Sequence, residues 1–166
     1  MIIGLDVSLR STGIAWLNGL TPTVWTVKSK SPQTVNEVSK LILSHIKPIL
    51  NDESIVYIED YAFGKFGKSS SVTSLIELTG ILQYELYNMQ IQYHKVAPTA
   101  VKKFLSGKGV LPKDQIPLLV YKKFDLILDT VDACDALAIA DYGYALTYDT
   151  GFNRELNITE KKCLPK

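Results

Sequence analysis

The chain has 166 residues, of which 46% are hydrophobic and 21% are charged. This size and balance suit one globular domain and argue against disorder. Its 18 basic residues nearly cancel its 17 acidic ones, so the net charge of +1 gives no sign of a nucleic-acid binder. We expect neither a signal peptide nor a membrane span, because no basic segment precedes an apolar core and no run of about 18 apolar residues exists. Two distant cysteines, Cys134 and Cys163, favour a reducing, cytoplasmic location.

Apolar periodicity and turn-forming residues predict five strands and five helices. Short apolar runs rich in Val, Ile and Trp predict strands, and apolar residues at helical spacing predict helices. The expected strands are residues 1–7, 12–17, 23–27, 55–58 and 91–96. The expected helices are residues 31–50, 72–88, 98–105, 112–124 and 131–148, with loops at 62–71 and 106–111.

The order of these elements predicts an α/β fold. Three successive strands form an antiparallel meander, and the later strands join it through helical crossovers. The expected product is a five-stranded mixed sheet, three antiparallel strands then two parallel ones, flanked by helices, which is the order of the RNase H-like fold. We expect this RNase H-like domain to span residues 1–148 and a loosely held polar tail to span 149–166.

Four acidic residues stand at the ends of these elements. Asp6 ends the first strand, Glu59 follows the fourth, and Asp132 and Asp135 open the last helix on one side of it. Taken singly, each also fits a structural role such as a strand end, a solvated surface position or a helix cap. Converging carboxylates repel one another and need cations or protons, and their hard oxygens suit Mg²⁺ or Mn²⁺. Two such ions can align an attacking water and a leaving oxygen at a phosphate.

Four segments, in order, resemble the RuvC-type resolvases: IIGLDVSLRSTGIAWL, VYIED, VAPTAVKKFLSGKGVLPKDQI and DACDALAIADYGYAL. The resemblance spans residues 1–146. It implies a Holliday junction resolvase active in DNA recombination and repair: a Mg²⁺-dependent endonuclease that works as a homodimer and makes paired nicks in four-way DNA junctions. It carries over Asp6, Glu59, Asp132 and Asp135 as catalytic metal ligands. It also places Lys102 and Lys113 near the cleaved phosphate and the backbone, with Lys113 as a catalytic residue.

Basic and aromatic residues flank the acidic positions. Residues 95–123 hold seven lysines and one acid, Asp114, a local balance of +6, and lysines there would meet phosphates. We expect DNA contacts from Lys102, Lys103, Lys108 and Lys113, and from Lys65 and Lys68 in the loop after the fourth strand. In the same loop Tyr61, Phe63 and Phe66 are candidates to stack on opened bases at a junction centre.

Other functions stay open at this point. The loop at residues 62–71 departs from the family pattern, so a nuclease for forks, flaps or three-way branches, or an RNA-processing relative, is an alternative. A binding module without hydrolysis is disfavoured because all four acids are present. An actin-like nucleotide-binding protein is disfavoured because no Gly-rich phosphate loop exists. Divergence of this kind suits a virus-encoded relative, so we expect the cytoplasm of a bacterium or of an infected host cell, near the nucleoid.

Overall fold

A computed structural model describes residues 1–30, 33–60 and 70–165. The strands are β1 (Ile2–Asp6), β2 (Ser11–Leu17), β3 (Thr23–Lys28), β4 (Ile55–Glu59) and β5 (Gln92–Val96). The helices are α1 (Val35–Ile46), α2 (Ser70–Asn88), α3 (Pro98–Ser106), α4 (Ile116–Phe124), α5 (Val131–Tyr148) and α6 (Ile158–Lys161). Two 3-10 turns, η1 (Lys47–Ile49) and η2 (Lys113–Gln115), follow α1 and precede α4.

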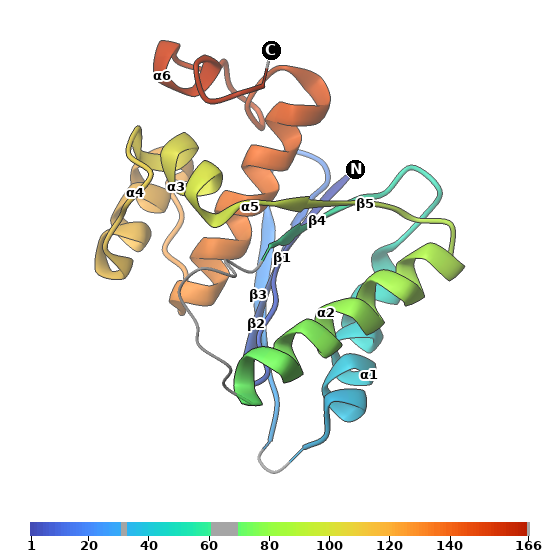
Figure 1. Cartoon of the computed structure of the whole chain (residues 1–166). Helices are drawn as coiled ribbons and strands as arrows, with labels where there is room; N and C mark the ends of the chain where they lie inside the picture. The colour runs from blue at the N-terminus through green and yellow to red at the C-terminus, as the bar shows by residue number, and fades with distance from the viewer. Residues whose placement is uncertain (31–32, 61–69, 166) are drawn as a thin grey trace.

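The strands form one mixed sheet in the order β3-β2-β1-β4-β5. β1 pairs antiparallel with β2 and parallel with β4, and β4 pairs parallel with β5. Helices α1 and α2 cover one face of the sheet, while α3, α4 and α5 lie on the other (Figure 1). The predicted fold class is confirmed, and none of the helices in the described part of the chain is long and apolar enough to cross a membrane.

Two helix boundaries differ from the expected ones for identifiable reasons. α1 begins at Val35 because Thr34 caps it, with Glu37 closing a capping box. The helix expected at 112–124 is divided into η2 and α4. Pro117 has no N–H, and its ring would clash with the carbonyl of Lys113 in a continuous α-helix. α4 therefore begins at Ile116, with Pro117 in its first turn.

Helix α5 packs directly on the sheet because glycines in the strands leave it room. A Cβ atom on Gly4 of β1 would overlap the carbonyl oxygen of Ala136, and one on Gly13 of β2 would overlap that of Asp132. Gly13 is also the residue that pairs with Asp6 in the β1–β2 ladder. The first turns of α5 therefore lie against the strand end that carries Asp6.

The C-terminal segment is packed, so the expectation of a loosely held tail is wrong for residues 149–165. Phe152 and Leu156 are buried in the core beside α5, and the side chain of Glu160 is only 2% exposed. Asn157 and Glu160 form a capping box for α6, a helix that the sequence pattern did not predict. The domain boundary at residue 148 stays a prediction.

Candidate active site

The sheet topology brings two acids to one edge. Leu5 of β1 pairs with Ile58 of the parallel strand β4, so the next residues, Asp6 and Glu59, end neighbouring strands at the same side of the sheet. Helix α5 opens beside them with Asp132 in its first turn. Asp135 follows three residues later, on the same side of the helix.

The four acids form one electrostatic cluster. Burial raises the pKa of Asp6 to about 8, and repulsion from Glu59, Asp135 and Asp132 adds to the effect. Burial also raises the pKa of Glu59 to about 7, with a further contribution from Asp135. The pKa of Asp135 is raised by burial and by the charge of Asp132. Without a compensating cation, the folded protein therefore holds protons here near neutral pH.

A pair of threonines fixes the start of α5. The Thr130 side chain caps the helix by accepting a hydrogen bond of 3.1 Å from the backbone N–H of Ala133. Its hydroxyl also meets that of Thr26 in β3 at 2.6 Å. The cap thus ties the helix to the sheet immediately before the two acids. Sequence reasoning missed Thr26, Thr130 and Gly13, since a strand glycine and a helix-cap threonine are common features with many structural uses.

Two of the expected basic residues reach the acids. The ammonium of Lys113 in η2 opposes the rise in the pKa of Asp6, Glu59 and Asp135, and Lys102 in α3 does so for Glu59 and Asp135. Positive charge from two separate segments is therefore next to the carboxylates. Their catalytic and DNA-binding roles stay predictions.

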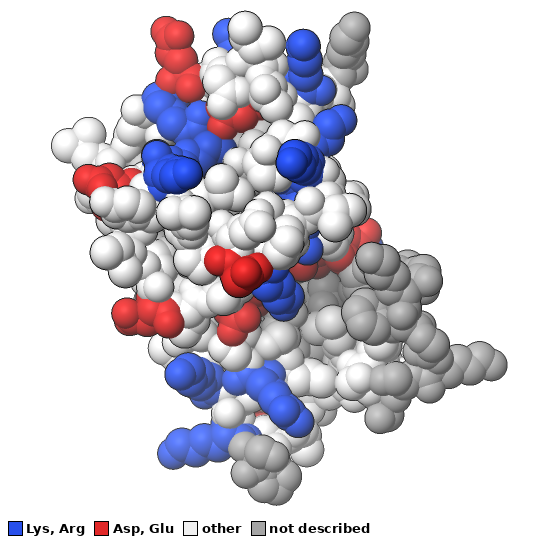
Figure 2. Space-filling model, turned by 90° about the vertical axis from the view of Figure 1, so that its left-hand side faces the viewer, with Lys and Arg blue, Asp and Glu red and all other residues white. Residues whose placement is uncertain are grey.

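The other expected basic residues of this segment have different surroundings. Lys103 and Lys108 are exposed on α3 and the turn after it. Lys95 pairs with Asp60 at 3.1 Å, and Lys123 pairs with buried acids, so these two contribute little free positive charge. On the face that carries α3 and α4, basic side chains gather in separate groups with acidic ones between them (Figure 2). The balance of +6 therefore overstates the charge available to DNA.

The expected loop contacts cannot be placed. Tyr61, Phe63, Lys65, Phe66 and Lys68 lie outside the described residues.

The donor set fits a hard divalent cation. Among the residues that the structure describes, no three His, Cys, Asp or Glu side chains form a ready-made metal-ligand group. The cluster nevertheless consists only of carboxylates, and repulsion within it helps to raise the pKa of Asp6, Glu59 and Asp135. Oxygen-only, negatively charged sites of this kind favour Mg²⁺ or Mn²⁺, and a bound cation would remove the repulsion.

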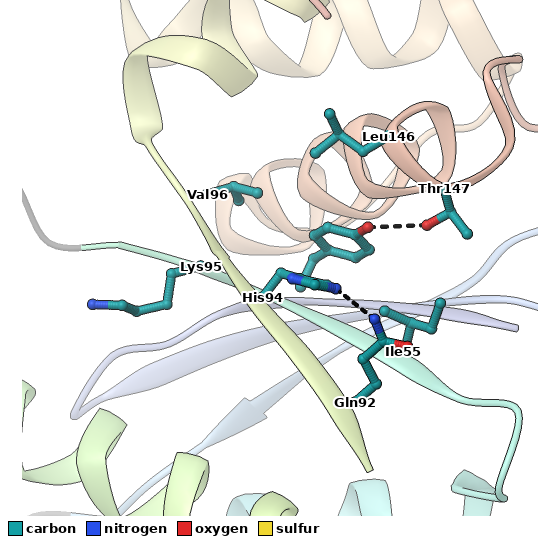
Figure 3. Close-up of a pocket in the computed structure, with 8 residues that line it drawn as sticks. Ile55, Gln92, His94, Lys95, Val96, Leu146 and Thr147 are labelled. Atoms are coloured by element: carbon teal, nitrogen blue, oxygen red, sulfur yellow. Dashed lines mark hydrogen bonds between the residues drawn. The ribbon is translucent and has the colours of Figure 1, made fainter. Parts of the chain in front are cut away.

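A hollow of about 370 Å³ lies elsewhere, between the far end of α5 and the edge strand β5. The ring of His94 stacks on Tyr57 at 5.3 Å, and the Tyr57 hydroxyl meets that of Thr147 at 2.9 Å (Figure 3). Thr147 is 12 residues beyond Asp135 in the same helix, about 18 Å along its axis. The hollow is therefore separate from the carboxylate cluster.

Comparison with known proteins identifies the family that this chain resembles. The family model described as crossover junction endodeoxyribonuclease RuvC matches residues 2–141. A RuvC from Ehrlichia canis is 30% identical over 152 residues, covering 84% of this chain and 92% of the relative. A RuvC from Rhodopirellula baltica is 24% identical over 153 residues, covering 87% and 86%. The structure of T. thermophilus RuvC with a Holliday junction substrate shares the fold, with a TM-score of 0.69 at 17% identity over 89% of this chain and 95% of that one.

Proposed function

Since the chain belongs to the RuvC family of crossover junction endodeoxyribonucleases, we propose that it resolves four-way DNA junctions at a centre made of Asp6, Glu59, Asp132 and Asp135. The protein is a nuclease, and its reaction is the hydrolysis of phosphodiester bonds in junction DNA. The observation that carries the assignment of the centre is the convergence of these four acids, from β1, β4 and α5, into one cluster in which the pKa values of Asp6, Glu59 and Asp135 are raised.

The proposed chemistry divides between a cation and the protein. Asp6, Glu59, Asp132 and Asp135 would hold the ion, Mg²⁺ by preference with Mn²⁺ as a substitute, and a bound ion supplies an activated water and stabilises the leaving oxygen. Lys113 and Lys102 are close enough for their charges to lower the pKa of Glu59 and Asp135. Their ammonium groups would draw the phosphate toward the acids, which alone would repel it, and would stabilise charge that develops during cleavage.

Junction resolution by paired nicks needs two such centres, so we propose a homodimer. Helix α2 supports this proposal, because Tyr84 and Tyr87 are 64% and 72% exposed and lie three residues apart on one side of it. Large exposed aromatic side chains are common at protein contacts. The proposed DNA surface includes the exposed Lys103 and Lys108, together with the basic and aromatic residues of the loop after β4. Action on DNA in the cytoplasm completes the proposal.

Cleavage of a labelled synthetic four-way junction tests the function. A fork, a flap, a three-way branch and a plain duplex serve as comparison substrates, each with Mg²⁺, with Mn²⁺ and with chelator. Paired symmetric nicks confined to the four-way junction are expected. Equal cleavage of several branches would instead favour the broader debranching nuclease, and binding without cleavage in either metal would favour a module that has lost hydrolysis.

Substitution of the acids tests the centre. We expect Asp6→Asn, Glu59→Gln, Asp132→Asn and Asp135→Asn each to abolish cleavage while junction binding and folding persist. Asp52→Asn, at an exposed position, is the matched control and should cleave at the wild-type rate. Retention of near wild-type cleavage by any of the four variants would remove that acid from the proposed centre.

A further inference from the structure

Four charged side chains, two buried acids and two partly exposed bases, form a cluster at a distance from the carboxylates. Asp141 of α5 and Glu160 of α6 are 1% and 2% exposed, and each is paired with both Lys123 and Arg154. The Lys123 ammonium nitrogen lies 3.1 Å from a carboxylate oxygen of Asp141 and 2.6 Å from one of Glu160. Both contacts are ion pairs whose angles do not meet the geometry of a hydrogen bond. The Arg154 guanidinium donates to Asp141 at 2.6 Å and to Glu160 at 2.9 Å.

The cluster connects three segments that are separate in sequence. Lys123 stands in the last turn of α4, Asp141 in the middle of α5, and Arg154 and Glu160 in the C-terminal segment. A buried ion cluster is a poor source of stability, because removing four charges from water offsets much of their attraction. The cluster instead restricts how the segments are placed relative to one another, because the planar guanidinium and the two carboxylates fit together in few arrangements. The cluster therefore fixes how α4 lies against α5.

The two helices run from the carboxylate cluster to this ion cluster. Lys113, immediately before α4, acts on Asp135 near the start of α5, and Lys123 at the end of α4 contacts Asp141 further along α5. The nine residues of α4 span about 13 Å. α4 thus runs along the first half of α5 in the same direction, with the two acids and Lys113 where both helices begin and the ion cluster where α4 ends, beside the middle of α5.

The exposure of Lys113 makes its position depend on α4. Residues 112–115 are exposed, whereas Ile116 and Val120 anchor α4 in the core next to α5. Lys113 thus stands on a short exposed stretch between buried Leu111 and buried Ile116, and a rotation or tilt of α4 would move it relative to the carboxylates. At the opposite end, the ion cluster opposes such a movement.

We propose that Arg154 is a positioning residue: it joins Asp141 to Glu160, the two acids that pair with Lys123 of α4, and through them it holds α4 against α5 and sets Lys113 near the carboxylates. The inference rests on the proposed function, because it assumes that Lys113 acts on the cleaved phosphate. Arg154 and Glu160 lie beyond residues 2–141, which the family model matches, so the segment that fixes Lys113 is outside the matched part of the chain.

A double-mutant cycle tests this role. Single-turnover cleavage of a four-way junction is measured at saturating protein and Mg²⁺ for wild type, Arg154→Gln, Lys113→Ala and the double variant. A lysine displaced by about 1 Å loses much of its effect, so Arg154→Gln should slow cleavage about 10-fold. Junction affinity should remain unchanged. In the Lys113→Ala background the same substitution should cause no further loss, because the group that it positions is already gone.

Two results would overturn the inference. One is a wild-type cleavage rate for folded Arg154→Gln. The other is a further loss of about 10-fold in the double variant, which would show that Arg154 acts independently of Lys113. Lys162→Gln makes the same change of charge at an exposed position in the same segment and should cleave at the wild-type rate.

A charge-preserving variant keeps the test valid if Arg154→Gln does not fold. Arg154→Lys retains the positive charge between Asp141 and Glu160 but loses the planar fork. It should slow cleavage by a smaller factor, on the order of threefold, and this loss should also vanish in the Lys113→Ala background. A thermal melting curve is recorded for every variant, and cleavage is assayed at a temperature below the lowest unfolding transition. Absence of junction cleavage by the wild-type protein would contradict the proposed function itself, whereas additive losses in an active protein contradict only the role of Arg154.

Discussion

The raised pKa of Asp6 predicts that the metal-free protein loses stability as the pH rises. The ordinary carboxyl pKa is 3.8, and burial beside three other acids raises that of Asp6 to about 8. Between these values the folded state keeps a proton that the unfolded chain has released, so the free energy of unfolding falls with increasing pH. The stabilising contribution of this proton is complete below pH 3.8 and is lost as the pH passes through about 8.

The size of the effect follows from the shift. Each pH unit within this window costs about 1.4 kcal/mol, and the slope flattens near the raised pKa, so a change from pH 6 to pH 8 removes about 2 kcal/mol through Asp6. Glu59, whose pKa is raised to about 7, adds a loss of about 1 kcal/mol over the same interval. For a chain of this length the Asp6 contribution alone corresponds to a melting temperature lower by about 4–8 °C. Asparagine has no proton to lose, so Asp6→Asn should show only the smaller decrease that Glu59 contributes and should melt above the wild type at pH 8 in chelator. Mg²⁺ at about 100 times its Kd should stabilise the wild type by about 2.7 kcal/mol.

Thermal melts at pH 6 and pH 8, with chelator and with Mg²⁺, measure these differences. Asp52→Asn is the control, because it removes an exposed carboxylate elsewhere and should follow the wild type at both pH values. The reasoning is refuted if the wild type in chelator melts at the same temperature at pH 6 and pH 8. It is also refuted if Asp6→Asn loses as much stability over this interval as the wild type does.

Three further predictions concern other parts of the molecule. Lys113→Ala should slow single-turnover cleavage on the order of 100-fold, because a charge that stabilises the transition state is lost. The control variant Lys122→Ala, at an exposed position, should cleave at the wild-type rate. A wild-type rate for Lys113→Ala would exclude the proposed role of Lys113. Gly13→Ala should lower stability by about 1–3 kcal/mol and reduce cleavage, because its Cβ atom would overlap the Asp132 carbonyl; a wild-type melting curve would contradict this packing. Replacing Phe63 and Phe66 with Ala should reduce the ratio of junction to duplex affinity in a binding titration, and an unchanged ratio would exclude them as the junction probe.

The fold could be predicted because its signals are local and mutually consistent. The strand ending at Asp6 and the strand ending at Glu59 are short apolar runs, and the periodic helices between strands imply parallel crossovers. The starts of α1 and α4 depend on single residues, Thr34 and Pro117, which the spacing of apolar residues does not register. The positions of Asp132 and Asp135 followed from family motifs and from their place at a helix start.

The C-terminal segment could not be predicted, because its burial depends on partners that are distant in sequence. Asp141, Arg154 and Glu160 are charged, and an isolated charged residue is expected on the surface. They become buried only as a mutually paired set together with Lys123, and no local pattern reveals that pairing. The same reason explains the overestimated basic surface, since lysines counted as free in the sequence are partly paired in the structure.

Packing and chemistry impose the same demands on α5. The raised pKa values of Asp6, Glu59 and Asp135 imply that their charged forms destabilise the fold when no cation is bound, so the helix that carries Asp135 needs secure anchorage. That anchorage comes from close contact with Gly4 and Gly13, from the Thr130 cap and from the Asp141 ion pairs. Close contact with a sheet requires small residues along the helix, and α5 is buried nearly all round. The small residues of DACDALAIADYGYAL are therefore as necessary to the centre as its acids, because they determine where those acids stand.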